Sequence, residues 1–162
     1  MDQTRLRLKA ADPQDLAVLA ACLQDARIPV REMVYMPAER RFAAAFTRYR
    51  RELLADPSSC VGLTERPAAL TVDDVAEVKY RGLDPAQLDR ELVLLTIATE
   101  PGRRHLIHID LVFEGDVWIQ LRTDAIRCRL EDFGEPVPCR RTPCDHFAQT
   151  SYAEMAGDAA SA

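Results

Sequence analysis

Many of the short patterns that mark a chemical activity are missing from this sequence. It has no G-x-G-x-x-G motif, no P-loop, no H-E-x-x-H zinc motif and no G-x-S-x-G nucleophile motif. These absences argue against an ordinary nucleotide-dependent enzyme or metalloprotease. No apolar run approaches the roughly 20 residues that a membrane-spanning helix needs. The charged start, MDQTRLRLKAADPQDL, lacks the apolar core of a signal peptide, so we expect a cytoplasmic protein without membrane contact.

Aromatic residues and lysine are also scarce. Aromatics make up 6% of the 162 residues, so aliphatic and alanine side chains must fill the core. The 2 lysines contrast with 19 arginines, but the arginines are spread along the whole chain, as GC-rich coding would produce. The net charge of −5 argues against non-specific nucleic-acid binding. With 48% apolar residues, the chain predicts one globular domain over residues 1–146 and a disordered tail over 147–162.

Local patterns predict one helix near the N-terminus, with short strands around it. Leu16, Leu19 and Leu23 follow helical spacing after a good N-cap, which predicts an amphipathic helix from Asp12 to Ala26. A short strand should precede it at residues 4–8, where polar and apolar residues alternate.

Two hairpins follow the predicted helix. The first has strands at Val30–Met36 and Arg41–Tyr49, the second strand with Phe42, Ala44 and Phe46 on its core face. Residues 52–66 read as a loop. Asp84 should cap a short helix, and Leu92–Thr99 begins the second hairpin.

The two halves of the chain share a rhythm that suggests an internal repeat. Each hairpin leads into a strand that is interrupted by an acidic residue, Asp74 or Asp124, and that ends near a glycine, Gly82 or Gly134. Either the sequence is duplicated or two antiparallel meanders simply resemble each other. The fold class we expect is α+β, mostly antiparallel β. Two three-stranded meanders would form a sandwich or a partly open barrel, with a pleckstrin-homology-like barrel as one option, and one N-terminal amphipathic helix would pack on a face.

The C-terminal stretch PVPCRRTPCDHF crowds cysteine and histidine together. Cys139, Cys144 and His146 supply three of the four ligands that a structural zinc needs, and Asp145 or Cys128 would have to complete the set. A disulfide is the other alternative to an ordinary tail. The pair of cysteines has no second knuckle, and two arginines between them would repel a cation. We therefore expect an extended tail with reducible cysteines and no metal or other cofactor.

The segment RRHLIHID contains a second candidate site. On a strand, His108 and Asp110 share one face, opposite Ile107, Ile109 and Leu111. A carboxylate beside an imidazole can orient a catalytic histidine, although no nucleophile is identifiable. The alternative is a solvent-facing pair without a chemical role. An enzyme would require a concave pocket around His108 that is lined by convergent polar groups.

The third candidate is the basic hairpin. We expect its contact residues to be Arg41, Arg48, Tyr49 and Arg50, because arginines with an interleaved aromatic can hold phosphates and stack a base. The same charges would also protect an edge strand from unwanted pairing. Nucleic acid is therefore an unlikely partner, while a partner protein or a second copy of the chain is favoured.

Several segments together resemble a known family. The stretches DLAVLAACLQDA, YMPAERRFAAAFTRYR and AIRCRLEDFGEP, with the proline-containing end, are similar to the bacterial Domain of Unknown Function 2948 family over most of residues 4–146. Because that family has no assigned activity, the resemblance implies no catalytic residue. We expect a small non-catalytic binding or protein-interaction module. The two alternatives are an enzyme that uses His108 and Asp110, and an anion or nucleic-acid binder that uses the basic hairpin.

Overall fold

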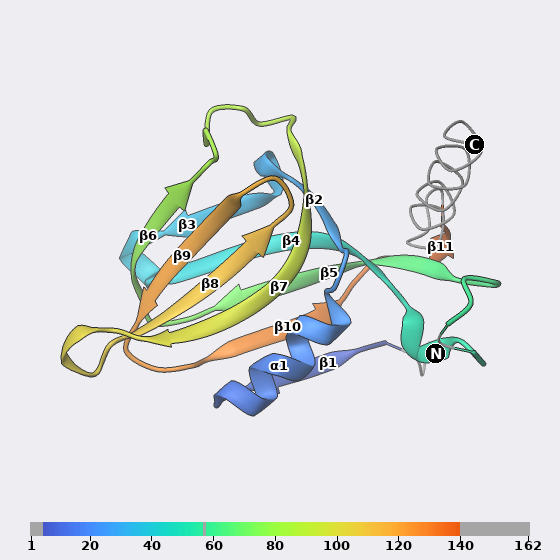
Figure 1. The fold of residues 1–162 in the computed structure, drawn as a ribbon, viewed down its shortest axis with the longest axis horizontal. Helices are drawn as coiled ribbons and strands as arrows, with labels where there is room; N and C mark the ends of the chain where they lie inside the picture. Colours follow the sequence, from blue (N-terminus) through green and yellow to red (C-terminus); the bar gives the residue numbers. More distant parts are fainter. Residues whose placement is uncertain (1–4, 57, 140–162) are drawn as a thin grey trace, which may run out of the picture.

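A computed structural model describes residues 5–56 and 58–139 of the chain. Its strands form two layers of one curved antiparallel sheet, with the apolar core between the layers (Figure 1). One layer contains β6, β9, β8 and β7, and the other contains β3, β4, β5, β10 and β1. The helix α1, Pro13–Cys22, lies against β1 and β7 at one side of the layers. No helix in the described residues is long and apolar enough to cross a membrane.

The strands of the first half are short up to β3 and longer from β4 onward. They are β1 (Arg7–Ala10), β2 (Arg27–Pro29), β3 (Met33–Met36), β4 (Arg41–Tyr49), β5 (Thr64–Val72) and β6 (Val75–Arg81). The second half contributes β7 (Glu91–Pro101), β8 (Ile107–Phe113), β9 (Val117–Thr123), β10 (Cys128–Asp132) and the two-residue β11 (Val137–Pro138).

The order of strands shows an exchange between the two meanders. The order is β1-β10-β5-β4-β2-β7-β8-β9-β6, with β3 on β4 and β11 on β5. β6 follows β5 along the chain but pairs with β9, whereas β10 follows β9 but pairs with β5. The strand that follows each meander along the chain therefore pairs with the other meander. The expected fold class is confirmed, and the sheet stays open. Duplication of the sequence remains a prediction.

The acidic interruptions lie where the chain crosses between layers. Asp73 and Asp74 connect β5 to β6, and the backbone N–H of Asp73 donates to the Arg127 carbonyl at 2.9 Å in the other crossing segment. Asp74 has a φ of 61°, which bends the chain sharply. Asp124 accepts from Arg40 at 2.6 Å. The predicted acidic interruptions are confirmed, and the ion pair of Arg127 with Asp74 at 3.4 Å joins the two crossings.

Several predicted elements differ from the structure in their bounds, including the first strand, which runs over Arg7–Ala10. The helix starts as expected, because Asp12 accepts from the Asp15 N–H at 2.7 Å, but it ends at Cys22 instead of Ala26. The strand expected over Val30–Met36 is broken, because a 3₁₀ turn at Val30–Glu32 separates β2 from β3 after Pro29.

The predicted short helix after Asp84 is only a turn. The Asp84 carboxylate accepts from the Ala86 N–H at 2.9 Å. The capping residue is therefore present, but too few residues follow it for a helix before β7.

The exchanged strand β6 ends in a close contact that only glycine permits. Gly82 has a φ of +70°, and a β-carbon there would stand 2.4 Å from the Asp116 carbonyl oxygen in the β8–β9 turn. Gly115 has a similar φ of +79°, but nothing lies within 4 Å of its β-carbon position. A substitution at Gly115 therefore tests backbone strain alone, whereas one at Gly82 tests strain together with a steric clash.

We expect Gly115→Ala to lower the free energy of unfolding by about 1–2 kcal/mol, since a left-handed backbone strains any β-carbon. Gly82→Ala should lower it by a further ~1–3 kcal/mol, because the backbone must also shift. Urea unfolding of both variants measures the difference. Equal losses would mean that β6 does not pack against the β8–β9 turn.

Candidate functional site

The centre of the basic hairpin is buried. The Arg48 side chain is 0% exposed and donates from Nε and Nη2 to the two carboxylate oxygens of Asp132 at 2.6 and 2.7 Å. Glu52 accepts from the other side of the same guanidinium at 2.8 Å. Burial by itself would lower the pKa of Arg48, but the hydrogen bonds to Asp132 and Glu52 raise it overall. Arg48 is a structural cation and presents no surface to a partner.

The other predicted contact residues lie in different surroundings. Tyr49 is buried, with Arg27 and Arg51 at 5.9 and 5.5 Å from its ring centroid. Arg50 is also buried and donates to the Thr64 hydroxyl at 3.3 Å. Arg41 is partly exposed and donates to Asp73 at 2.8 Å. The structure therefore does not gather the four residues into one exposed patch, and the binding role predicted for Arg41, Arg48, Tyr49 and Arg50 stays a prediction.

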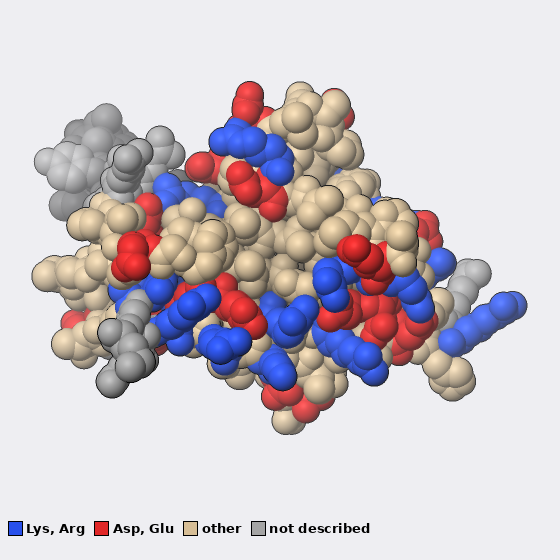
Figure 2. Space-filling view, turned by 180° about the vertical axis from the view of Figure 1, so that it is seen from behind, with Lys and Arg blue, Asp and Glu red and all other residues tan. Residues whose placement is uncertain are grey.

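Charges of both signs alternate over the layer that contains β4, β5, β10 and β1. On the side shown in Figure 2, basic and acidic side chains are intermingled, and no wide area has a single sign. Exposed ion pairs explain this pattern, among them Arg129 with Asp73 at 3.8 Å and Arg7 with Glu131 at 3.7 Å. This face lacks the continuous positive stripe that holds a nucleic-acid backbone.

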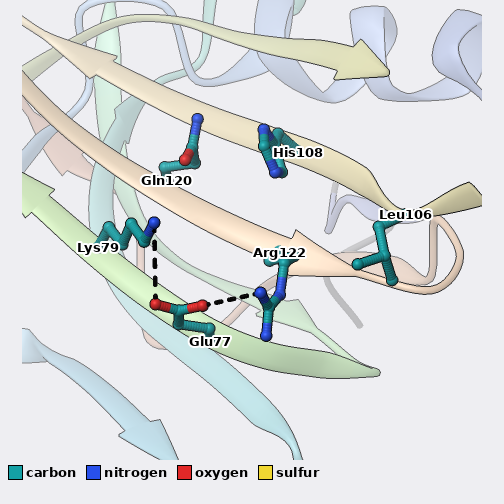
Figure 3. A pocket seen from close by; sticks show the side chains of 6 residues that line it. All are labelled: Glu77, Lys79, Leu106, His108, Gln120 and Arg122. Atoms are coloured by element: carbon teal, nitrogen blue, oxygen red, sulfur yellow. Dashed lines mark ion pairs between the residues drawn. The ribbon is translucent and has the colours of Figure 1, made fainter. Parts of the chain in front are cut away.

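A pocket of about 300 Å³ lies on the layer formed by β6, β9, β8 and β7 (Figure 3). Its lining side chains come from three neighbouring strands and the turn before β8: Glu77 and Lys79 from β6, Gln120 and Arg122 from β9, His108 from β8, and Leu106 from the turn. That turn lies against His108, since a β-carbon on Gly102 would stand 3.3 Å from the imidazole Nε2. Sequence analysis found only His108 among these residues.

The register of the sheet extends the pocket into one polar face, which we call the pocket face. Side chains directly opposite each other on antiparallel strands point to the same side. Three rows follow across β6, β9 and β8: Glu77, Arg122 and His108; Lys79, Gln120 and Asp110; Arg81, Trp118 and Val112. The pocket face is defined by these nine residues.

Two buried polar atoms on the pocket face have no partner. Asp110 is 5% exposed, and its Oδ1 accepts no hydrogen bond from the described residues. Arg122 Nε is likewise buried and unpartnered within the described part of the chain, although its Nη1 lies 3.1 Å from Glu77. Elsewhere in the sheet, Arg27 Nε is also buried without a hydrogen-bond partner in the described residues. Unsatisfied buried groups are rare in native proteins, and a hollow beside them points to a missing ligand or water.

The pocket face also carries the single tryptophan of the chain. Trp118 is 38% exposed, and the Arg81 guanidinium lies 4.6 Å from its ring centroid. An exposed aromatic with a neighbouring cation is typical of binding surfaces, where a rigid ring provides contact area at a low entropy cost.

The His108–Asp110 pair is not the one that sequence analysis described. The two side chains share a face as predicted, but Asp110 is buried, so the interpretation as a solvent-facing pair is wrong. No hydrogen bond between the imidazole and the carboxylate occurs in residues 5–56 and 58–139. The sequence pattern could place both residues on one face, but it could not show what covers Asp110.

The cysteine-rich end lies largely outside the described residues. Cys144, Asp145, His146 and the predicted tail 147–162 belong to that part, so the expectations for them stay predictions. Cys22, Cys128 and Cys139 are free thiols. Burial, then the charge of Asp73, raises the pKa of Cys128 to about 12, which keeps this thiol protonated. No group of three metal-ligating side chains occurs in the described ranges.

These features define an α+β domain with an open antiparallel sheet and a polar pocket on one face. Residues 6–146 match the family described as "Protein of unknown function (DUF2948)", so the chain belongs to this family, as the sequence resemblance predicted. No curated protein and no solved structure matches the chain. The family assignment therefore gives no activity, and the pocket face carries the functional argument.

The two buried aspartates should respond oppositely to the same substitution. Asp132 is paired with Arg48, so Asp132→Asn should lower the free energy of unfolding by about 3 kcal/mol or more. Asp110 Oδ1 is buried without a partner in the described residues, so Asp110→Asn, which replaces the carboxylate by a neutral amide, should raise stability by ~1 kcal/mol. Urea unfolding at neutral pH compares them, and a loss of stability in Asp110→Asn would show that the Asp110 carboxylate is satisfied.

Proposed function

We propose that this protein is a non-catalytic binding module of the cytoplasm whose ligand or partner covers the pocket face. The observation that carries the proposal is the buried Nε of Arg122, a lining residue of the 300 Å³ pocket, which has no hydrogen-bond partner in the described residues. Asp110 does not line the pocket, but it lies opposite the lining residue Gln120, and its buried Oδ1 also has no partner in the described residues. Folding desolvates these atoms at a cost that only a bound donor and acceptor can recover. Polar groups that converge on a concave surface are the usual mark of a binding site.

The geometry supports the pocket face over the basic hairpin as the contact surface. Arg48 and Arg50 are buried, so an alanine at either position would disturb the fold before it tested any binding. The pocket residues Lys79 and Arg122, in contrast, keep part of their side chains in solvent. Their substitution can change binding while the core stays intact.

An enzyme that uses His108 and Asp110 is the second candidate. The pocket around His108, lined by polar groups, is the feature that this alternative required. The lining has an acid, bases and an imidazole, but no hydroxyl or thiol side chain, and the described residues do not orient His108 through Asp110. A binding role requires neither a nucleophile nor an oriented imidazole, so we rank it above the enzyme.

A substitution that fills the pocket should prevent the partner from binding to the pocket face. Gln120→Trp places a bulky ring between the three strands that line the pocket, while Thr71→Trp places the same ring on β5 in the other layer. We expect Gln120→Trp to lose at least one partner that wild type retains in quantitative affinity capture from native cells, and Thr71→Trp to keep it. Light scattering of the three proteins tests a second copy as the partner.

Equal retention in both variants would contradict the proposed face. Equal loss in both would indicate a folding defect, which circular dichroism of the purified variants detects independently.

A further inference from the structure

The guanidinium of Arg122 has one occupied edge and one free edge. Its Nη1 lies 3.1 Å from Glu77 Oε2, so that side of the group is neutralised (Figure 3). Nε is buried, and it donates to no described residue. The free edge presents Nε–H and the neighbouring Nη2–H in parallel, a fork that matches the two oxygens of a carboxylate.

The charges in the lining fit a single negative charge. Lys79 and Arg122 are cations and Glu77 is the one acid among the six lining residues, so these three side chains together carry one excess positive charge. Lys79 lies 3.9 Å from Glu77 and is largely exposed, which leaves its ammonium able to turn toward an anion. The pocket volume of 300 Å³ is at the small end of the range for ligand sites, which restricts the ligand to a small molecule.

Asp110 further restricts which charges and polar groups the ligand can carry. Its carboxylate lies one row from Arg122, opposite Gln120 and next to His108 on the same face. A second negative charge on the ligand would face Asp110 and Glu77 without compensation. A hydroxyl or ammonium on the ligand, in contrast, would give the buried Oδ1 the donor that it lacks.

We propose that the pocket binds a small monocarboxylic acid, with the carboxylate on the free edge of Arg122 and a 2-hydroxy or 2-amino group toward Asp110. This inference rests on the pocket face being the binding surface. It adds the chemical class of the ligand to the proposed function.

A graded set of probes tests the class. Propionate, lactate, alanine, succinate, inorganic phosphate and lactate methyl ester are titrated into the full-length protein, with amide chemical shifts and the fluorescence of Trp118 as readouts. We expect lactate or alanine to bind with a dissociation constant below roughly 10 mM and more tightly than propionate, succinate or phosphate. The ester should not bind, because it lacks the carboxylate.

Two matched arginines provide the variants. Arg122 and Arg129 are both 42% exposed and both face an acidic partner, but only Arg122 lines the pocket. Arg122→Gln should weaken binding about tenfold or more, since it removes a charged bidentate contact, while Arg129→Gln should leave it unchanged. Asp110→Asn should abolish the preference for lactate or alanine over propionate.

The possible results show whether the ligand class or the proposed function is wrong. Phosphate that binds as tightly as the carboxylates would overturn the ligand class, and so would carboxylate binding that persists in Arg122→Gln. If no carboxylate binds, a water molecule satisfies Arg122 and Asp110 and the inference fails. The proposed function then still stands if Gln120→Trp loses a partner that Thr71→Trp retains.

Discussion

The buried ion pair between Arg48 and Asp132 is the interaction on which the rest of the structure depends. Both side chains are 0% exposed, and the Asp132 carboxylate also accepts from the Leu6 N–H at 2.9 Å. Arg48 belongs to β4 in the first meander, whereas Asp132 ends β10, which the chain reaches only after the second meander. The pair therefore fixes the exchanged strand β10 beside β5, together with the incoming β1. Neither charge could remain buried without the other.

The exchange of strands also builds the candidate site. β6 is contributed by the first half of the chain, yet it supplies Glu77 and Lys79 to a pocket whose other strands, β8 and β9, come from the second half. If β6 stayed beside β5, these residues would lie in the other layer. The packing that holds the crossings, including the ion pair of Arg40 with Asp124, therefore positions functional side chains as well as the core.

Much of the fold could be predicted because strand alternation is a local property. Phe42, Ala44 and Phe46 are all buried on one face of β4, as their spacing indicates. The same spacing places Arg48 on that core face, and Asp132 continues the core face of Cys128 and Leu130 on β10. An arginine and an aspartate, each at the end of the apolar face of a strand, could therefore have indicated a buried ion pair. Sequence analysis missed it because it assigned the arginines to a surface.

The site could not be predicted in the same way, because pairing between distant strands is not a local property. Alternation places His108 and Asp110 on one face, but it does not reveal that β6 and β9 are their neighbours. The burial of Asp110 likewise depends on side chains from other strands. The contrast is between Asp132, whose carboxylate pairs with Arg48, and Asp110, whose Oδ1 accepts no hydrogen bond from the described residues. A buried carboxylate that is paired contributes to the fold, and one with an unsatisfied oxygen marks a candidate site.

A double-mutant cycle on Arg48 and Asp132 tests this account most directly. Arg48→Met, Asp132→Leu and the double variant are compared with wild type by urea unfolding. We expect each single variant to lose about 3–5 kcal/mol, and the double variant to lose at least ~2 kcal/mol less than their sum, because it leaves no unpaired buried charge. Additive losses, or single losses below ~1 kcal/mol, would show that the pair does not hold the exchanged strand.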